Sequence, residues 1–421
     1  NNSAGIYVPG THNWINGAFG VELKNNGGNS LGSAGIYSKS AIDLQAHYIH
    51  LNGSGASNGN GQNNVGVYTP GTGTANGVMV NLGIGRIKMT GGANNTGIAV
   101  ENQGSVHSES DMVLDGGTNN TAIFADGKNT TNTNVTNDWE ATARSISTSN
   151  TTTDNIFIFA DNGARVKTHE TLGGLKVQST VSADPLSGTS TPTTGAVYAK
   201  RGAKVDISRR TTNSFTTSTD WNVDVTGKQV GKLVAGKWQA IDEYTGFGLY
   251  AGRGAQISAK YNNIKVEDGG TAVASVGSDG TTFSNIDLSG TAANPGSTVE
   301  YKGKGYALFS KDGGKIDLSY GTLTLRGEAT GYSRDVTAAT PSITLTDTKL
   351  NVFSNDVIVA NLTGVTTFNT NNSYINGNPS NTIGTYIPIT KITNTEGGTT
   401  YNGYKYTVFD GIDVNVDSNI D

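Results

Sequence analysis

The 421-residue chain contains no cysteine, which excludes a disulfide framework, iron–sulfur clusters and cysteine-based zinc sites. Charged residues make up only 15% of the chain, against roughly 25% in ordinary globular domains. The net charge is -5 and no basic stripe is visible, so the sequence gives no electrostatic sign of nucleic-acid binding. No segment approaches the roughly 18 consecutive apolar residues of a membrane helix. We therefore expect neither nucleic-acid binding nor membrane insertion of this chain.

Proline is also scarce, with 8 residues, whereas the 58 glycines make up about 14% of the chain, roughly twice average usage. The chain is longer than the roughly 250–300 residues at which a single hydrophobic core stops growing. A stacked repeat escapes this limit, because each repeat contacts only its neighbours. The composition therefore favours a glycine-rich repeat protein over one large globular core.

A short pattern recurs along the chain: glycine, a small or aromatic residue, an aliphatic, an aromatic, a small residue, two polar residues and glycine. The clearest copies are GAVYAKRGAKVDIS (195–208), GFGLYAGRGAQISA (246–259) and GYALFSKDGGKIDLS (305–319). Early copies follow one another after 30 or 31 residues, and later copies after 24 to 52. Self-similarity of this kind is the mark of a repeat architecture.

Between the copies lie short segments with period-two alternation, such as AIDLQ (41–45) and YIHLNG (48–53), bounded by Gly, Asn or Asp. This pattern is typical of strands with a turn on each side. Three short strands per period of about 30 residues predict an all-β fold: a right-handed parallel β-helix (solenoid) with inserted loops. Its coils would be stacked about 4.8 Å apart. The expected core contains the inward aliphatics Ile36, Ile42, Leu44, Ile49 and Leu51.

The predicted organisation has β-helix coils over 1–365 and less regular final coils or a junction over 366–421. Loop insertions are expected near 8–19, 126–150 and 209–245. The sequence reads as a piece of a longer protein, and we expect it to be monomeric.

The three repeat copies quoted above, followed by an Asn/Gly turn and a further strand, resemble the passenger domains of large type V autotransporter adhesins. They are most similar to the giant fusobacterial outer-membrane autotransporters, and the resemblance covers roughly 1–360. It implies a secreted β-helix displayed on the cell surface, tethered to the outer membrane by a C-terminal β-barrel absent from this sequence. It also implies adhesion, with host galactose-type glycans, host receptor proteins or neighbouring bacterial surfaces as partners.

Departures from a repeat are where function is expected, because insertions map to loops. All four tryptophans lie in the predicted insertions: Trp14, Trp139, Trp221 and Trp238. Tryptophan offers a broad, stiff binding face. Polar neighbours that can donate or accept directional hydrogen bonds are Asp220, Asn222, Arg209, Arg210, Lys237 and Asp242. The alternative interpretation is that each tryptophan covers the core beneath its own loop.

Enzyme signatures are weak by comparison. The paired aspartates and the glycine-flanked histidine of polysaccharide-cleaving β-helices do not occur, nor does a serine-hydrolase elbow with a plausible partner set. The five histidines are scattered, so no metal site or cofactor is expected. We therefore predict no enzymatic activity and no catalytic residues.

The sequence thus favours a surface adhesin fragment that binds host glycan or a host or bacterial surface protein. The alternatives are a structural stalk that holds a distal binding tip and, less favoured, a polysaccharide-cleaving β-helix. Insertions longer than 20 residues argue against a plain stalk, which should have short uniform corners.

Overall fold

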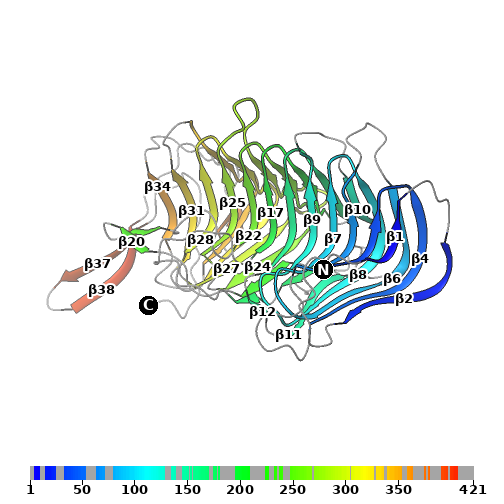
Figure 1. Cartoon of the computed structure of the whole chain (residues 1–421). Helices are drawn as coiled ribbons and strands as arrows, with labels where there is room; N and C mark the ends of the chain where they lie inside the picture. Colours follow the sequence, from blue (N-terminus) through cyan, green and yellow to red (C-terminus); the bar gives the residue numbers. More distant parts are fainter. Residues whose placement is uncertain are drawn as a thin grey trace. The chain divides into compact units, whose positions relative to one another are not determined.

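Figure 1 shows the chain as a computed structural model. The residues that the structure describes are 4–9, 15–24, 33–53, 63–71, 79–128, 134–138, 145–150, 152–153, 155–169, 174–177, 179–180, 195–208, 223–226, 232–234, 237–239, 247–267, 270–303, 305–326, 329–335, 339–352, 358–363, 374–375, 378–379, 390–396 and 399–405. Within them every regular element is a strand, and most strands belong to long parallel ladders. The expected all-β, parallel-strand class is therefore confirmed.

The chain divides into two compact units, which we describe separately. Unit 1 comprises Asn1–Ser182, Pro192–Ser218 and Ala255–Ile257. Unit 2 comprises Ala183–Thr191, Thr219–Gly254 and Ser258–Asp421.

The first sheet of unit 1 is a parallel ladder in which one strand comes from each copy of the repeat (Figure 1). The strands lie in the order β1 (Ala4–Val8), β3 (Ala34–Ser38), β5 (Val65–Thr69), β7 (Thr96–Glu101), β9 (Thr121–Asp126), β13 (Ile156–Asp161) and β17 (Gly195–Lys200). The aliphatic residues aligned from the sequence are paired in register: Ile6, Ile36, Val67, Ile98, Ile123, Ile158 and Val197. The alignment of the repeat copies in this unit is therefore confirmed residue by residue.

The second sheet of unit 1 begins with long strands and then divides. Its first four strands pair in parallel: β2 (Ile15–Lys24), β4 (Ile42–Gly53), β6 (Met79–Gly91) and β8 (Ser105–Asp115). The first half of β8 continues into a ladder with β10 (Asn134–Asp138), β14 (Arg165–His169) and β18 (Lys204–Asp206). Its second half continues into β11 (Ser145–Asn150) and β15 (Gly174–Val177). A short parallel pair, β12 (Thr152–Thr153) and β16 (Ser179–Thr180), completes the unit. Two parts of the predicted insertion 126–150 are thus ladder strands.

Unit 2 repeats the same arrangement with ladders of its own. The first contains β22 (Phe247–Gly252), β25 (Gly270–Val276), β28 (Gly305–Lys311), β31 (Ala329–Asp335) and β34 (Ile358–Thr363). A second contains β26 (Asn285–Asp287), β29 (Lys315–Asp317) and β32 (Ser342–Thr344), and the residues of β23 (Gln256–Ser258) are divided between the units. The third contains β19 (Val223–Thr226), β24 (Asn263–Glu267), β27 (Thr298–Lys302), β30 (Thr322–Arg326) and β33 (Lys349–Val352).

Three pairs among the described strands of unit 2 are antiparallel. Within the predicted insertion 209–245, β20 (Lys232–Val234) pairs with β21 (Lys237–Gln239). Within 366–421, β35 (Tyr374–Ile375) pairs with β36 (Asn378–Pro379), and β37 (Thr390–Glu396) pairs with β38 (Thr399–Lys405).

The cores of both units are rows of stacked aliphatic side chains. Four residues expected in the core are buried, with exposed fractions of 0% for Ile36, 1% for Leu44, 2% for Ile49 and 1% for Leu51. The side chain of Ile42 lies outside the described residues. In unit 2 the corresponding aliphatic residues Leu249, Val273 and Leu308 are completely buried.

In several copies the core strand is followed by a polar residue and a glycine that form a tight turn. Both residues have positive φ in Asn162–Gly163 (50° and 82°), Arg201–Gly202 (47° and 72°) and Asp312–Gly313 (49° and 82°). Consecutive positive φ values are the requirement of a type I′ turn, which glycine meets at no steric cost. This backbone requirement explains why the repeat keeps a glycine at that point.

A ladder of buried asparagines, which was not predicted from the sequence, joins five coils of unit 1. The amide N–H of Ser33 donates to Asn64 Oδ1 at 3.2 Å, and the N–H of Asn64 donates to Asn95 Oδ1 at 2.9 Å. The N–H of Asn95 donates to Asn120 Oδ1 at 2.9 Å, and that of Asn120 to Asn155 Oδ1 at 2.6 Å. Each asparagine directly precedes a strand of the first sheet. The ladder therefore pairs backbone amides that would otherwise be buried without a partner.

Candidate binding groove

The tryptophan sites predicted from the sequence are described only in part. Trp14, Trp139, Trp221, Arg209, Arg210, Asp220, Asn222 and Asp242 lie outside the described residues. Lys237 and Trp238 lie on β21, in antiparallel register with Val234 and Leu233 on β20. This pair is separate from the parallel ladders, and the binding platform around it stays a prediction.

The described surface feature with the character of a binding site is a row of aromatic side chains on the first sheet of unit 1. In each strand the residue after the core aliphatic occupies this row, and the register aligns Tyr7, Tyr37, Tyr68, Ala99, Phe124, Phe159 and Tyr198. We call it the aromatic row. Since successive side chains of a strand point to opposite faces and the aliphatic faces the core, the row lies on the outer face. Ring centroids are 5.4 Å apart for Tyr7 and Tyr37, and 5.3 Å apart for Tyr37 and Tyr68.

A groove of about 790 Å³ runs over the N-terminal part of this row. It is lined by the rings of Tyr7, Tyr37, Tyr68 and Phe124, and also by Ala99, the one position of the row without a ring. Tyr7, on the edge strand β1, is 55% exposed, and Tyr37, Tyr68 and Phe124 are partly exposed. The volume falls in the roughly 300–1,000 Å³ range of small-ligand sites. The groove therefore has the size and the aromatic lining of a ligand site.

Ala99, which is only 5% exposed, leaves a gap in the row of rings between two aromatic neighbours. In register it lies between Tyr68 on β5 and Phe124 on β9, and a methyl group is far shorter than either ring. We call this gap the Ala99 notch. Glu101, the last residue of β7, also lines the groove.

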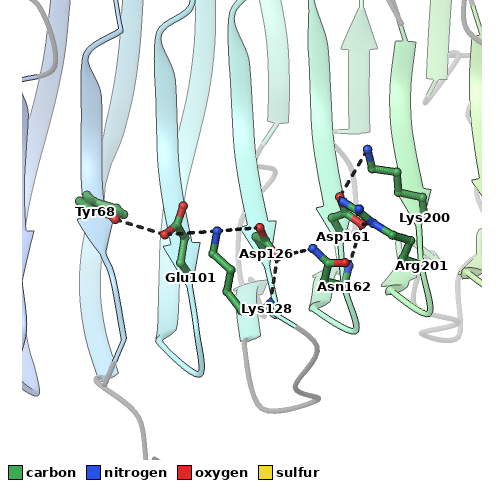
Figure 2. A network of polar contacts seen from close by, with 8 residues as sticks. All are labelled: Tyr68, Glu101, Asp126, Lys128, Asp161, Asn162, Lys200 and Arg201. Atoms are coloured by element: carbon green, nitrogen blue, oxygen red, sulfur yellow. Dashed lines mark hydrogen bonds and ion pairs between the residues drawn. The ribbon is translucent and has the colours of Figure 1, made fainter. Parts of the chain in front are cut away.

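Glu101 begins a network of polar contacts across the ends of successive strands (Figure 2). The Tyr68 hydroxyl donates to Glu101 Oε2 at 3.3 Å. Lys128 Nζ lies 3.9 Å from Glu101 Oε2 and 3.1 Å from Asp126 Oδ2. Glu101 and Asp126 are paired in register, and Lys128 stabilises two carboxylates that would otherwise repel each other.

The network continues to the next two strands (Figure 2). Asn162 Nδ2 donates to Asp126 Oδ1 at 2.8 Å. Asp161 accepts a bidentate pair of hydrogen bonds from Arg201, and Lys200 Nζ lies 3.4 Å from its Oδ2. Lys200 also lies over the Phe159 and Tyr198 rings, 5.0 Å and 5.5 Å from their centroids. That end of the aromatic row therefore stacks against the chain's own cation.

These contacts shift the pKa values of three groups in the network. Burial, together with the nearby Glu101 carboxylate, raises the pKa of Tyr68 to about 12, so the hydroxyl stays a hydrogen-bond donor. Burial alone would raise the pKa of Asp126. Hydrogen bonds from Asn162 and Lys128 outweigh it and hold that pKa below its ordinary value. The hydrogen bond to Asp161 raises the pKa of Arg201.

Stacking and hydrogen bonding are the chemistry that this arrangement offers. Among the described residues, no three His, Asp or Glu side chains come close enough to hold a metal ion. The recurring aromatic is a regular part of the repeat, whereas the sequence indicated function in departures from the repeat. The signal was present in the period of 30 and 31 residues that separates Tyr7, Tyr37 and Tyr68.

Comparisons with protein-family models, curated proteins and solved structures found no match to this chain. The part of the chain that the structure describes contains no helix long and apolar enough to span a membrane.

Proposed function

We propose that each unit is a stretch of right-handed parallel β-helix with inserted loops. In unit 1 the chain passes from a strand of the first sheet to the second sheet and returns beside the strand it left, as in β3, β4 and β5. Parallel crossover connections are right-handed in about 98% of cases. The in-register rows and the turns with positive φ support stacked coils.

We further propose that the chain is part of a surface-displayed bacterial adhesin tethered to the outer membrane by a β-barrel beyond this sequence. The observation that carries the binding role is the groove over Tyr7, Tyr37 and Tyr68, which leaves large rings accessible on the outer face. Exposed aromatic rings are the groups on which binding sites concentrate their energy. The resemblance of the repeat copies to autotransporter passenger domains supports surface display. The partners are a host glycan, a host receptor protein or a neighbouring bacterial surface, and the 209–245 insertion with Trp221 and Trp238 is a second candidate contact.

The test is binding of the fluorescently labelled 421-residue chain to cultured epithelial cells and to bacterial cells. An adhesin fragment should bind at least one cell type saturably, and unlabelled chain should compete. Tyr37→Ala should weaken this binding by about tenfold or more, since a central aromatic contact typically contributes 1–2 kcal/mol or more.

Trp238→Ala tests in the same assay whether the 209–245 insertion contributes to cell binding. Phe309→Ala, which removes an aromatic ring from unit 2, serves as the control and should leave binding unchanged. If the folded chain binds no cell surface, a structural stalk is the better explanation.

A further inference from the structure

The lining of the groove is almost entirely uncharged. Glu101 is the only ionisable acid or base among its lining residues apart from the tyrosines, and Lys128 lies 3.9 Å from its carboxylate. The other polar groups are hydroxyls and one amide, contributed by Tyr7, Tyr37, Tyr68, Ser33, Thr96 and Asn63. A surface of rings and hydroxyls complements a ligand that itself combines apolar faces with many hydroxyls.

The network beside the groove is also balanced in charge. The carboxylates of Glu101, Asp126 and Asp161 face the cations of Lys128, Lys200 and Arg201. Because these opposite charges neutralise each other at close range, little net field from the network extends into the groove. One further cation lies nearby, since Lys39 Nζ is 5.9 Å from the centroid of the Tyr37 ring. A strongly acidic or strongly basic ligand would disturb the existing ion pairs of the network.

The groove is long as well as neutral. Its lining residues come from five successive strands, β1, β3, β5, β7 and β9. Neighbouring strands lie about 4.8 Å apart, so the groove extends for about 19 Å across the sheet. A ligand that fills it must be a chain of several units rather than a single small ring.

We propose that this groove binds a neutral, linear oligosaccharide laid across the strands, with sugar faces against the aromatic row and one sugar seated in the Ala99 notch. In that seat Glu101 accepts hydrogen bonds from sugar hydroxyls. The Tyr68 hydroxyl, already hydrogen-bonded to Glu101, helps to fix the position of the carboxylate. This inference rests on the proposed binding function and names the class of ligand for it.

The competing occupant of an aromatic groove is a proline-rich peptide in the polyproline II conformation. That helix advances about 3.1 Å per residue with three residues per turn, so it presents a face about every 9 Å. The centroids of the Tyr7, Tyr37 and Tyr68 rings instead repeat at 5.4 Å and 5.3 Å, with ring planes inclined at 41° and 69°, so the row offers one separate aromatic contact for each sugar unit of about this length. The ring spacing therefore favours the sugar chain.

The probes are pentasaccharides of β-1,4-linked glucose, β-1,4-linked N-acetylglucosamine and β-1,4-linked galactose, with a proline decamer for comparison. Binding to the 421-residue chain is measured by titration calorimetry, and saturation-transfer NMR identifies the ligand protons that contact the protein. We expect at least one pentasaccharide to bind, with saturation transfer to the axial protons of its sugar faces. The matching monosaccharide should bind at least tenfold more weakly.

Two variants localise the site. Ala99→Phe fills the notch with the kind of residue that other coils carry at the same position, so the fold should accept it while pentasaccharide binding falls at least tenfold. Glu101→Gln keeps the shape and should also weaken binding. Phe283→Ala is the control: Phe283 is a 40% exposed ring in unit 2, and its removal should leave binding unchanged.

Each outcome separates the two proposals. Failure of all three pentasaccharides to bind, or equal binding by folded Ala99→Phe and the wild type, overturns the oligosaccharide site. If cell binding persists in that case, the adhesin proposal stands with another ligand or another surface. Binding of the proline decamer alone, lost in Ala99→Phe, assigns the groove to a peptide partner instead.

Discussion

Asp126 shows how a single residue in this fold is stabilised in its charged form. Its carboxylate is mostly buried, yet it accepts hydrogen bonds from Asn162 Nδ2 and from the Lys128 backbone N–H, and it pairs with Lys128 Nζ at 3.1 Å. These interactions favour the ionised form over the protonated form. Because the pKa is lower in the folded state, the charged carboxylate stabilises the fold above the ordinary pKa of an aspartate, about 3.9.

The first consequence is a pH-dependent stability difference between the wild type and Asp126→Asn. The stabilisation by Asp126 should be fully present at neutral pH and should be lost as the pH falls below about 4 through the lowered pKa. The wild type should therefore be the more stable protein at pH 7, and the difference should shrink towards pH 3. Urea unfolding at a series of pH values measures this. A stability difference that does not change with pH would show that the effect of the substitution is not electrostatic.

The residues that form the core and the groove could be predicted from the sequence only in part. The inward aliphatics such as Ile36 were predictable, because period-two alternation and burial follow from the same strand geometry. The groove could not be predicted, because its tyrosines occupy a regular position of the repeat. Only the strand register brings Tyr68, Ala99 and Phe124 side by side. Ala99 in particular has no sequence signal of its own, since its significance lies in the rings on either side.

At the scale of elements, the asparagine ladder fixes where strands of unit 1 begin. Asn95 both accepts from the Asn64 amide and has its own amide bonded to Asn120, each at 2.9 Å, and it is only 2% exposed. Removing its side chain leaves the buried Asn64 N–H without this partner. An unsatisfied buried donor costs about 1–3 kcal/mol.

We therefore expect Asn95→Ala to lower the free energy of unfolding of unit 1 by about 1–3 kcal/mol. Thr118→Ala is the matched control, because Thr118 is exposed and makes its contacts to Asn94 and Gly92 through the backbone. The control should change stability by no more than about 0.5 kcal/mol. Thermal and urea melts compare the two, and equal melts would mean that water replaces the lost side chain.

The strands themselves could be predicted from the sequence better than their connections. Glycine-bounded alternating segments predicted β3, β28 and β30 closely, because the pattern and the turn chemistry agree. The division of the second sheet after β8 could not be predicted, because it depends on which half of a long strand each later segment joins. The asparagine ladder was likewise hidden, since an Asn before a strand is equally typical of an ordinary turn.

At the scale of the whole molecule, stability should be local. Most described strands pair with the equivalent strands of the preceding and following copies, and the chain forms two units with separate sets of internal contacts. In such quasi-one-dimensional proteins, stability is approximately a sum of repeat terms and nearest-neighbour interfaces. Damage to one coil should therefore spread to its neighbours and weaken with distance along the stack.

A reciprocal pair of core substitutions tests this property. Ile36 in unit 1 and Leu308 in unit 2 are both 0% exposed, and each is paired in register with an aliphatic residue of the preceding strand. A lone carboxylate in either narrow core has no partner and costs several kcal/mol. Ile36→Asp should therefore raise amide exchange in β1, β3 and β5 by about 100-fold or more, equivalent to about 2.8 kcal/mol of opening free energy. The same substitution should leave β25, β28 and β31 protected. Leu308→Asp should produce the reverse pattern, whereas loss of protection throughout both units in either variant would show that the chain unfolds as one cooperative body rather than as a stack of coils.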